Sequence, residues 1–200
     1  MLTAFQDFLY SCAISFDLPV LDWIQANLQS SFMDKFMPFI TVFGDAGIFW
    51  MIISALLLIF PKTRRTGLGM AIAMMIGLLV CNVTLKPLVA RIRPYDLQAE
   101  LGVTIRLLCD AQHDFSFPSG HTIASFEAAV VMLKNSKKLG IPAMILAVLI
   151  SFSRMYLYVH YPTDVIASVI LGTLFALIGN GLAGLIAPKL RFGKKGKYEA

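Results

Sequence analysis

Long apolar stretches alternate with short polar or charged segments along most of this chain. Residues 66–85 and 165–187 contain no charged side chain, and residues 139–153 contain none before Arg154. A helix needs about 20 consecutive apolar residues to cross the hydrocarbon core of a bilayer. The pattern therefore predicts membrane-spanning helices.

The fold class predicted from these stretches is an all-α, polytopic transmembrane helical bundle that forms a single domain over residues 1–200. We expect about six spans, with a turn at residues 44–47 between the first two and the catalytic core in the last four. The expected spans are residues 32–43, 48–60, 66–90, 119–134, 139–158 and 162–187.

The first 30 residues have a different pattern. Apolar residues recur there at helical spacing, but Asp7, Asp17, Pro19 and Asp22 interrupt them. This favours an interfacial amphipathic helix over the alternative, a first span that enters the membrane obliquely. The other end of the chain, residues 188–200, is expected to be a basic cytoplasmic tail.

Composition and charge support a membrane protein. The chain is 58% hydrophobic and 14% charged, with a net charge of +5. Eleven of the 17 cationic residues fall in three groups, at residues 62–65, 134–138 and 189–197. The positive-inside rule places these groups on the cytoplasmic side, and with them both termini of a multi-pass plasma-membrane protein. The expected partner is the bilayer and a membrane lipid rather than nucleic acid.

The chemistry-bearing residues fall at the opposite, outer ends of the spans, in three short motifs. A transferring phosphoryl group needs positive charge around its oxygens, which lysine and arginine supply. A helix N-terminus with serine and glycine adds backbone N–H donors. The motifs are Lys86 with Arg93-Pro94, then Pro118-Ser119-Gly120-His121, then Ser153-Arg154 with His160 and Asp164.

The two histidines can divide the chemistry between them. Asp164 follows His160 by four residues, so its carboxylate can accept a hydrogen bond from one imidazole nitrogen and leave the other free for attack. His121 can then protonate the leaving oxygen and later activate water. No cluster of acidic residues indicates a metal site, and no cofactor is expected.

The three motifs, in this order and spacing over residues 86–164, resemble the signature of the type 2 phosphatidic acid phosphatase superfamily, and the layout resembles its small bacterial lipid phosphatases. The resemblance implies a phosphohistidine intermediate on His160, with His121 as general acid and base and Asp164 orienting the nucleophile. The residues that it implies for phosphate binding are Lys86, Arg93, Ser119, Gly120 and Arg154.

The expected function is therefore metal-independent hydrolysis of a phosphorylated lipid at the outer leaflet. Undecaprenyl diphosphate is the first choice of substrate, because an outward-facing site suits recycling of a wall-carrier lipid. The alternative is a phosphatidylglycerolphosphate or phosphatidic acid phosphatase. A non-catalytic lipid-binding or transport protein is a third hypothesis, which the intact His121, His160 and Asp164 argue against.

Four polar residues outside the motifs also need an interpretation. Arg91 is interpreted as an interfacial anchor, and Arg106 and His113 as parts of a solvated loop. Glu127 lies inside a span, where an acid is expensive and usually faces the bundle interior or water. A structural hydrogen bond and a role in the substrate cleft both remain open for Glu127.

Overall fold

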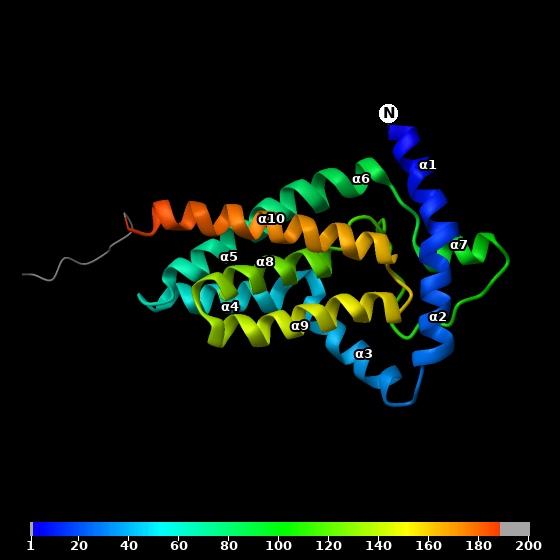
Figure 1. Ribbon diagram of the computed structural model, residues 1–200, viewed down its shortest axis with the longest axis horizontal. Helices are drawn as coiled ribbons and strands as arrows, with labels where there is room; N and C mark the ends of the chain where they lie inside the picture. Colours follow the sequence, from blue (N-terminus) through cyan, green and yellow to red (C-terminus); the bar gives the residue numbers. More distant parts are fainter. Residues whose placement is uncertain (1, 189–200) are drawn as a thin grey trace, which may run out of the picture.

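The structure is a bundle of long helices with two further helices lying across one end (Figure 1). It is a computed structural model and describes residues 2–188. The helices are α1 (Leu2–Cys12), α2 (Leu18–Leu28), α3 (Met33–Thr41), α4 (Ile48–Ile59), α5 (Arg64–Gly77), α6 (Lys86–Val89), α7 (Pro94–Glu100), α8 (Gly120–Asn135), α9 (Lys137–Tyr156) and α10 (Pro162–Ile186). Two π-helical segments, Ala13–Asp17 and Leu78–Leu85, and one 3₁₀ segment, Val42–Gly47, connect consecutive helices.

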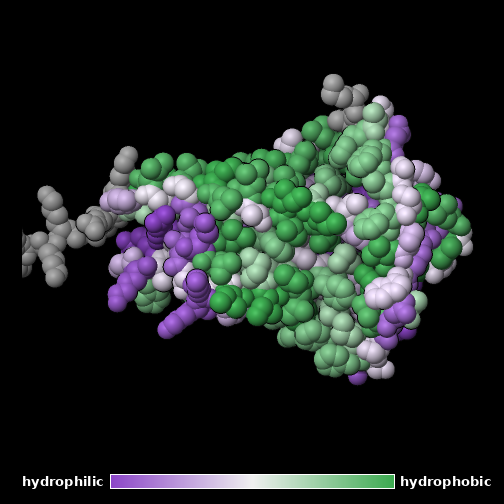
Figure 2. All heavy atoms as spheres, in the orientation of Figure 1, coloured by the Kyte–Doolittle hydropathy of each residue, from purple (hydrophilic) through white to green (hydrophobic). Residues whose placement is uncertain are grey.

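The apolar helices form a multi-pass membrane bundle. Four helical stretches are long and apolar enough to cross a membrane: Met33–Ile59, Arg64–Glu100, Lys137–Tyr156 and Pro162–Ile186. The 16-residue helix α8 packs against α5, α9 and α10 in the middle of the bundle. Figure 2 shows apolar side chains around the middle of the bundle and hydrophilic ones toward both ends. The protein is therefore an all-α transmembrane protein, as the apolar stretches predict.

The first two predicted spans are one broken span. Helices α3 and α4 continue in the same general direction along the bundle (Figure 1) and together make up the candidate span Met33–Ile59. The predicted turn at residues 44–47 is present as a kink, in which Ala46 and Gly47 take φ values of 48° and 67°. This kink interrupts the helix without reversing the chain, so the predicted number of six spans is not confirmed.

The first helices of the chain and the end of its last helix lie at opposite ends of the bundle. Helices α1 and α2 lie across the end of the bundle where α9 ends and α10 begins, whereas the last turn of α10 lies at the opposite end (Figure 1). The prediction that both termini are cytoplasmic required an even number of spans, and it is not confirmed. The basic groups at residues 62–65 and 134–138 follow α4 and α8 at the end away from α1 and α2, and residues 189–200 of the tail lie outside the described residues.

Small residues and one buried hydrogen bond fix the helices that carry the site. A Cβ atom on Gly179 of α10 would lie 2.6 Å from the carbonyl oxygen of Gly69 in α5, so the two backbones are in direct contact. Close approach through small residues is the usual way in which membrane helices pack. In α4, the buried Trp50 Nε1 donates to Ser125 Oγ of α8 at 3.0 Å. These contacts hold α8 and α10 in fixed positions relative to α4 and α5.

Candidate active site

A cavity of about 560 Å³ opens between α4, α5, α8 and α9 at the end of the bundle near α1 and α2. Five predicted site residues with basic side chains line it, and they come from five separate places in the fold. Lys86 begins α6, Arg93 precedes α7, His121 is the second residue of α8, Arg154 lies in the last turn of α9, and His160 precedes α10. The fold therefore brings the basic residues of all three motifs to one cavity.

Arg154 is the most deeply buried cation of this cavity, with 2% of its surface exposed. Its Nη1 atom donates to Thr41 Oγ1 at 2.7 Å. Its Nε and Nη2 atoms have no hydrogen-bond partner among residues 2–188. Buried donors without partners are unfavourable, and a guanidinium offers two parallel N–H groups that match an oxyanion. Arg154 is therefore prepared to bind an anion in the cavity.

Lys86 and Arg93 share a carboxylate that the sequence motifs did not identify. Each cation pairs with one oxygen of Asp114, and Arg93 Nε also donates to the Asp114 carbonyl oxygen at 2.8 Å. Burial alone would raise the pKa of Asp114, but hydrogen bonds and attraction from Lys86 and Arg93 outweigh it and lower this pKa to about 2. A phosphate that binds these two cations must compete with an ionised Asp114.

His160 lines the cavity and is almost completely buried, with 2% of its surface exposed. Its Nε2 atom lies 3.4 Å from Arg93 Nη1, and its Nδ1 atom lies 3.5 Å from Asp164 Oδ2. Burial, together with the positive charges of Arg93 and Arg154, holds the pKa of His160 well below its usual value. The imidazole is therefore neutral at neutral pH, which is the state that a nucleophile requires.

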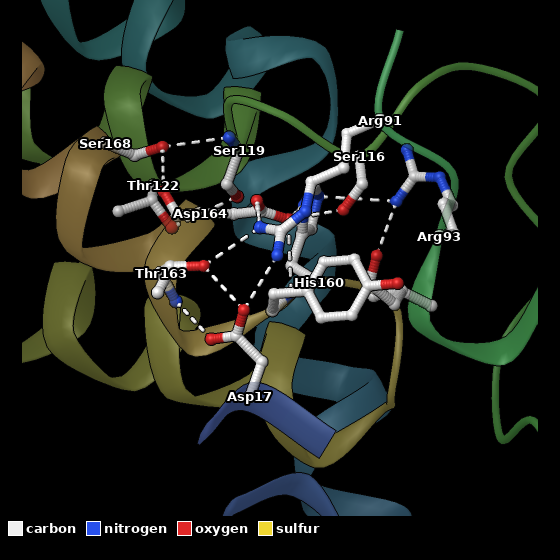
Figure 3. A network of polar contacts seen from close by, with 12 residues as sticks. Asp17, Arg91, Arg93, Ser116, Ser119, Thr122, His160, Thr163, Asp164 and Ser168 are labelled. Carbon is white, nitrogen blue, oxygen red and sulfur yellow. Dashed lines mark hydrogen bonds and ion pairs between the residues drawn. The ribbon is translucent and has the colours of Figure 1, made fainter. Parts of the chain in front are cut away.

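Asp164 lies in the first turn of α10 and is completely buried. Its Oδ1 atom accepts a hydrogen bond from Arg91, and its Oδ2 atom accepts from Ser116 Oγ and from the Tyr161 amide. Figure 3 shows Asp164 in the middle of this network. The 3.5 Å separation from His160 is an ion-pair distance rather than a hydrogen bond, so the carboxylate faces the imidazole but is fixed by other groups.

Arg91 is one of those groups, and its interpretation as an interfacial anchor is wrong. Only 7% of its surface is exposed, and it pairs with both Asp17 and Asp164. Its guanidinium carbon also lies 3.8 Å from the centre of the Tyr161 ring. A charge this deeply buried requires charged partners, and two carboxylates supply them. The sequence did not reveal this, because Asp17 lies 74 positions away from Arg91.

His121 has a carboxylate partner that the sequence interpretation missed. Its Nε2 atom lies 2.8 Å from Asp45 Oδ1, in the kink between α3 and α4. The neighbouring Gly44 packs against the imidazole, since a Cβ atom there would lie 2.6 Å from His121 Cδ2. The glycine-rich composition of residues 44–47 was a signal for a turn, but nothing in it indicated a histidine partner.

Ser119 and Gly120 lie at the N-terminus of α8, as the motif predicts, but only Gly120 lines the cavity. Ser119 is fully buried, its amide donates to Ser168 Oγ at 2.8 Å, and its hydroxyl accepts from Thr122. The phosphate-binding role of Ser119 stays a prediction, and the contacts show it tying α8 to α10 (Figure 3).

Glu127 lines the deeper part of the same cavity, with Oε1 lacking a hydrogen-bond partner among the described residues. Glu127 therefore faces the cavity, and its Oε1 atom makes no structural hydrogen bond within residues 2–188. Arg106 and His113 are exposed and do not line the cavity. Within residues 2–188, no three histidine, cysteine or acidic side chains are grouped closely enough to hold a metal ion.

A family model described as the PAP2 superfamily matches residues 64–183, which include all three motifs. The chain belongs to the PAP2 superfamily. This confirms the resemblance to the type 2 phosphatidic acid phosphatases. The matched range includes the basic residues of all three motifs, which are distant in sequence and line one cavity.

Relatives within the PAP2 superfamily match most of the chain. An undecaprenyl-diphosphatase from Sulfolobus acidocaldarius is 35% identical over 161 residues, which cover 80% of this chain and 75% of the relative. The undecaprenyl-diphosphatase BcrC from Bacillus subtilis is 26% identical over 160 residues, or 80% of each chain. The crystal structure of a transmembrane PAP2-type phosphatidylglycerolphosphate phosphatase from Bacillus subtilis matches with a TM-score of 0.70 and 26% identity, over 92% of this chain and 95% of that one.

Family, relatives and apolar helices together establish the general function. This PAP2 protein is a membrane lipid phosphatase, a hydrolase that acts on a phosphoric ester or diphosphate. The relatives differ in the lipid that their names specify, so the identity of the headgroup has to be argued from the site.

Proposed function

We propose that this PAP2 protein removes the terminal phosphate of undecaprenyl diphosphate at the outer leaflet, through a phosphohistidine on His160. The proposal rests on the cavity, which is cationic at one end and mostly apolar along the rest, with Glu127 as a polar residue in its deeper part. The apolar part is lined by Met51 and Leu58 of α4, Met74 and Met75 of α5, and Leu78.

The apolar part also reaches the lipid-facing surface of the bundle. Met51, Met75 and Leu78 line the cavity and are about half exposed on the outside, at 49%, 56% and 48%. A lipid tail can therefore enter sideways between α4 and α5 and stay in an apolar setting. Exposing the tail to water instead would cost about 0.8 kcal/mol per CH₂ group. A prenyl chain can leave the cavity through such a cleft and remain in the bilayer along the rest of its length.

In the first step, His160 Nε2 attacks the terminal phosphorus and the bond from that phosphorus to the bridging oxygen breaks. His121 donates a proton to the departing undecaprenyl phosphate. Lys86, Arg93 and Arg154 stabilise the charge on the equatorial oxygens, and the N-terminus of α8 at Gly120 adds backbone N–H groups. Asp164 faces the other imidazole nitrogen and stabilises the positive charge that the ring acquires.

In the second step, His121 accepts a proton from water, whose oxygen attacks the phosphorus of the phosphohistidine. The P–N bond breaks, phosphate leaves, and His160 returns to its neutral state. All charge compensation in both steps comes from side chains and backbone of this chain, so the proposed reaction requires no metal.

The test is phosphate release from four substrates in the same mixed micelles, with His160→Ala as the blank. The substrates are undecaprenyl diphosphate, phosphatidylglycerol phosphate, phosphatidic acid and glucose 6-phosphate. We expect the largest kcat/KM for undecaprenyl diphosphate and the smallest for the soluble ester. Equal efficiency on glucose 6-phosphate would rule out sideways entry, and a higher kcat/KM for a glycerophospholipid would replace the proposed substrate.

Phosphatidylglycerol phosphate is the second candidate, and Glu127 is the observation that favours it. This buried carboxyl group faces the cavity one to two helical turns below His121. A glycerol backbone offers polar atoms at such a depth, whereas a prenyl chain offers none. If the second candidate is right, Glu127→Gln should lower kcat/KM for phosphatidylglycerol phosphate more than for undecaprenyl diphosphate.

The proposed orientation puts the active site on the extracytoplasmic side, with α1 and α2 lying at that surface and the C-terminus in the cytoplasm. The basic residues at 62–65 and 134–138 lie at the other end of the bundle and support this choice. In a background without native cysteines, the exposed Thr104→Cys should react with an impermeant thiol reagent on intact cells. The exposed Lys137→Cys should react only after permeabilisation, and the reverse pattern would invert the proposed topology.

A further inference from the structure

The N-terminal helices reach the nucleophile's carboxylate through a buried chain of ions (Figure 3). Asp17, in the π-helical segment between α1 and α2, accepts a hydrogen bond from Arg91 Nη2 at 2.7 Å. On the other side of the same guanidinium, Arg91 Nη1 donates to Asp164 Oδ1. Neither carboxylate is exposed to solvent. One cation therefore connects a helix outside the bundle to the residue that faces His160.

Asp17 also contacts the start of the helix that carries Asp164. Its Oδ1 atom accepts from the Thr163 amide at 2.9 Å, and its Oδ2 atom accepts from the Thr163 hydroxyl at 2.7 Å. The first amides of a helix have no partners within the helix, so an acceptor from elsewhere stabilises its first turn. Asp17 therefore holds α10 directly as well as through Arg91.

We propose that Asp17 and Arg91 are positioning residues for the reaction, which set both the place and the charge of Asp164 behind His160. The inference rests on the proposed phosphohistidine mechanism. Because Asp17 shares the charge of Arg91, Asp164 keeps enough negative charge to stabilise the positive ring that forms when His160 is phosphorylated. Without Asp17, Arg91 pairs with Asp164 alone and weakens that stabilisation.

This role affects the chemical step and leaves phosphate binding unchanged. Lys86 and Arg93, which would hold the substrate, pair with Asp114, and Arg154 donates to Thr41. Asp17 touches none of them in its hydrogen bonds or ion pairs. The structure therefore assigns to Asp17 an effect on kcat with no effect on KM or on competitive inhibition by inorganic phosphate.

Asp22 provides a matched control from the same N-terminal region. It lies in α2, where its Oδ1 atom accepts from Tyr158 OH at 2.6 Å. Asp22 thus attaches the N-terminal helices to the same end of the bundle without touching Arg91 or Asp164. Replacing it weakens the docking of these helices and preserves the ion chain.

The test compares Asp17→Asn, Asp22→Asn and wild type as full-length proteins in mixed micelles, with undecaprenyl diphosphate and phosphatidylglycerol phosphate as substrates. We expect Asp17→Asn to lower kcat about tenfold, with KM and the inhibition constant of inorganic phosphate unchanged. Asp22→Asn should keep the wild-type kcat, and thermal unfolding of both variants reports any loss of stability separately.

Thr163→Val makes the test independent of whether Asp17→Asn folds. It removes the hydroxyl that Arg91 and Asp17 share but keeps both ion pairs, so a smaller fall in kcat at constant KM is expected. An unchanged kcat in both variants, or an equal loss in Asp22→Asn, would overturn the positioning role. Absence of phosphate release by wild type from either lipid would instead refute the proposed function.

Discussion

The two histidines of this site have carboxylate partners in opposite settings. Asp164 behind His160 is completely buried and is fixed by Arg91, Ser116 and a backbone amide. Asp45 beside His121 has 58% of its side chain exposed, and within residues 2–188 its carboxylate contacts one polar side chain, that of His121. The nucleophile needs a fixed orientation, whereas the general acid and base must exchange protons with water. The two environments match these separate tasks.

The largest difference should appear when the buried carboxylate is neutralised. Asp164→Asn keeps the shape of the side chain but removes the charge that stabilises the His160 ring, so kcat should fall by about 10³-fold. Binding of inorganic phosphate should change little, because Asp164 does not line the cavity. Steady-state kinetics with undecaprenyl diphosphate and competition by inorganic phosphate measure the two effects. A loss that appears in KM alone would mean that Asp164 acts in binding.

Neutralising the exposed carboxylate should have a smaller effect. Asp45→Asn weakens the orientation of His121 but leaves the imidazole and its access to water intact. We expect kcat to fall about tenfold, which is a fraction of what general acid–base catalysis contributes. The same assay measures it beside Asp164→Asn. If the two variants lose equal activity, the contrast between the pairs has no functional meaning.

A third carboxylate, that of Asp114, contacts neither histidine. Its replacement therefore tests anion binding separately from the chemical step. Asp114 pairs with Lys86 and Arg93, so Asp114→Asn should free these cations for an incoming anion. Because Asp114 is half exposed, we expect vanadate, an analogue of phosphate, to bind at most about fivefold more tightly. Isothermal titration or inhibition kinetics at neutral pH, well above the Asp114 pKa of about 2, tests this. Weaker vanadate binding would show that Asp114 supports the anion site instead of competing for it.

The smallest expected effect is that of chelation, which should leave activity unchanged. In the proposed mechanism, Asp45 and Asp114 serve His121 and the two cations, and neither acts as a metal ligand. Phosphate release with excess EDTA should equal release without it, with micelle composition held constant. Loss of activity that added Mg²⁺ or Mn²⁺ restores would mean that these carboxylates have a metal-dependent role.

The sequence predicted the parts of this site that depend on local patterns. Lys86, Arg93, His121, Arg154 and His160 lie in short motifs next to long apolar stretches, and both signals can be read without knowing tertiary contacts. Asp45, Asp114 and Asp17 escaped notice because each meets its partner only after folding, across 76, 28 and 74 positions. The predicted number of spans is not confirmed for a related reason, since residues 44–47 are equally compatible with a reversal and with a kink.

The central claim is that phosphate passes through His160, and the stereochemistry at phosphorus tests it most directly. The substrate is undecaprenyl diphosphate with a chiral terminal phosphorus, whose three non-bridging positions carry one sulfur and two different oxygen isotopes. It is hydrolysed in water that contains the third oxygen isotope. The configuration of the released thiophosphate is then determined. Two successive in-line displacements, first by His160 and then by water, predict overall retention, and His160→Ala should release no product. Overall inversion would show that water attacks the substrate directly, which would contradict the phosphohistidine mechanism.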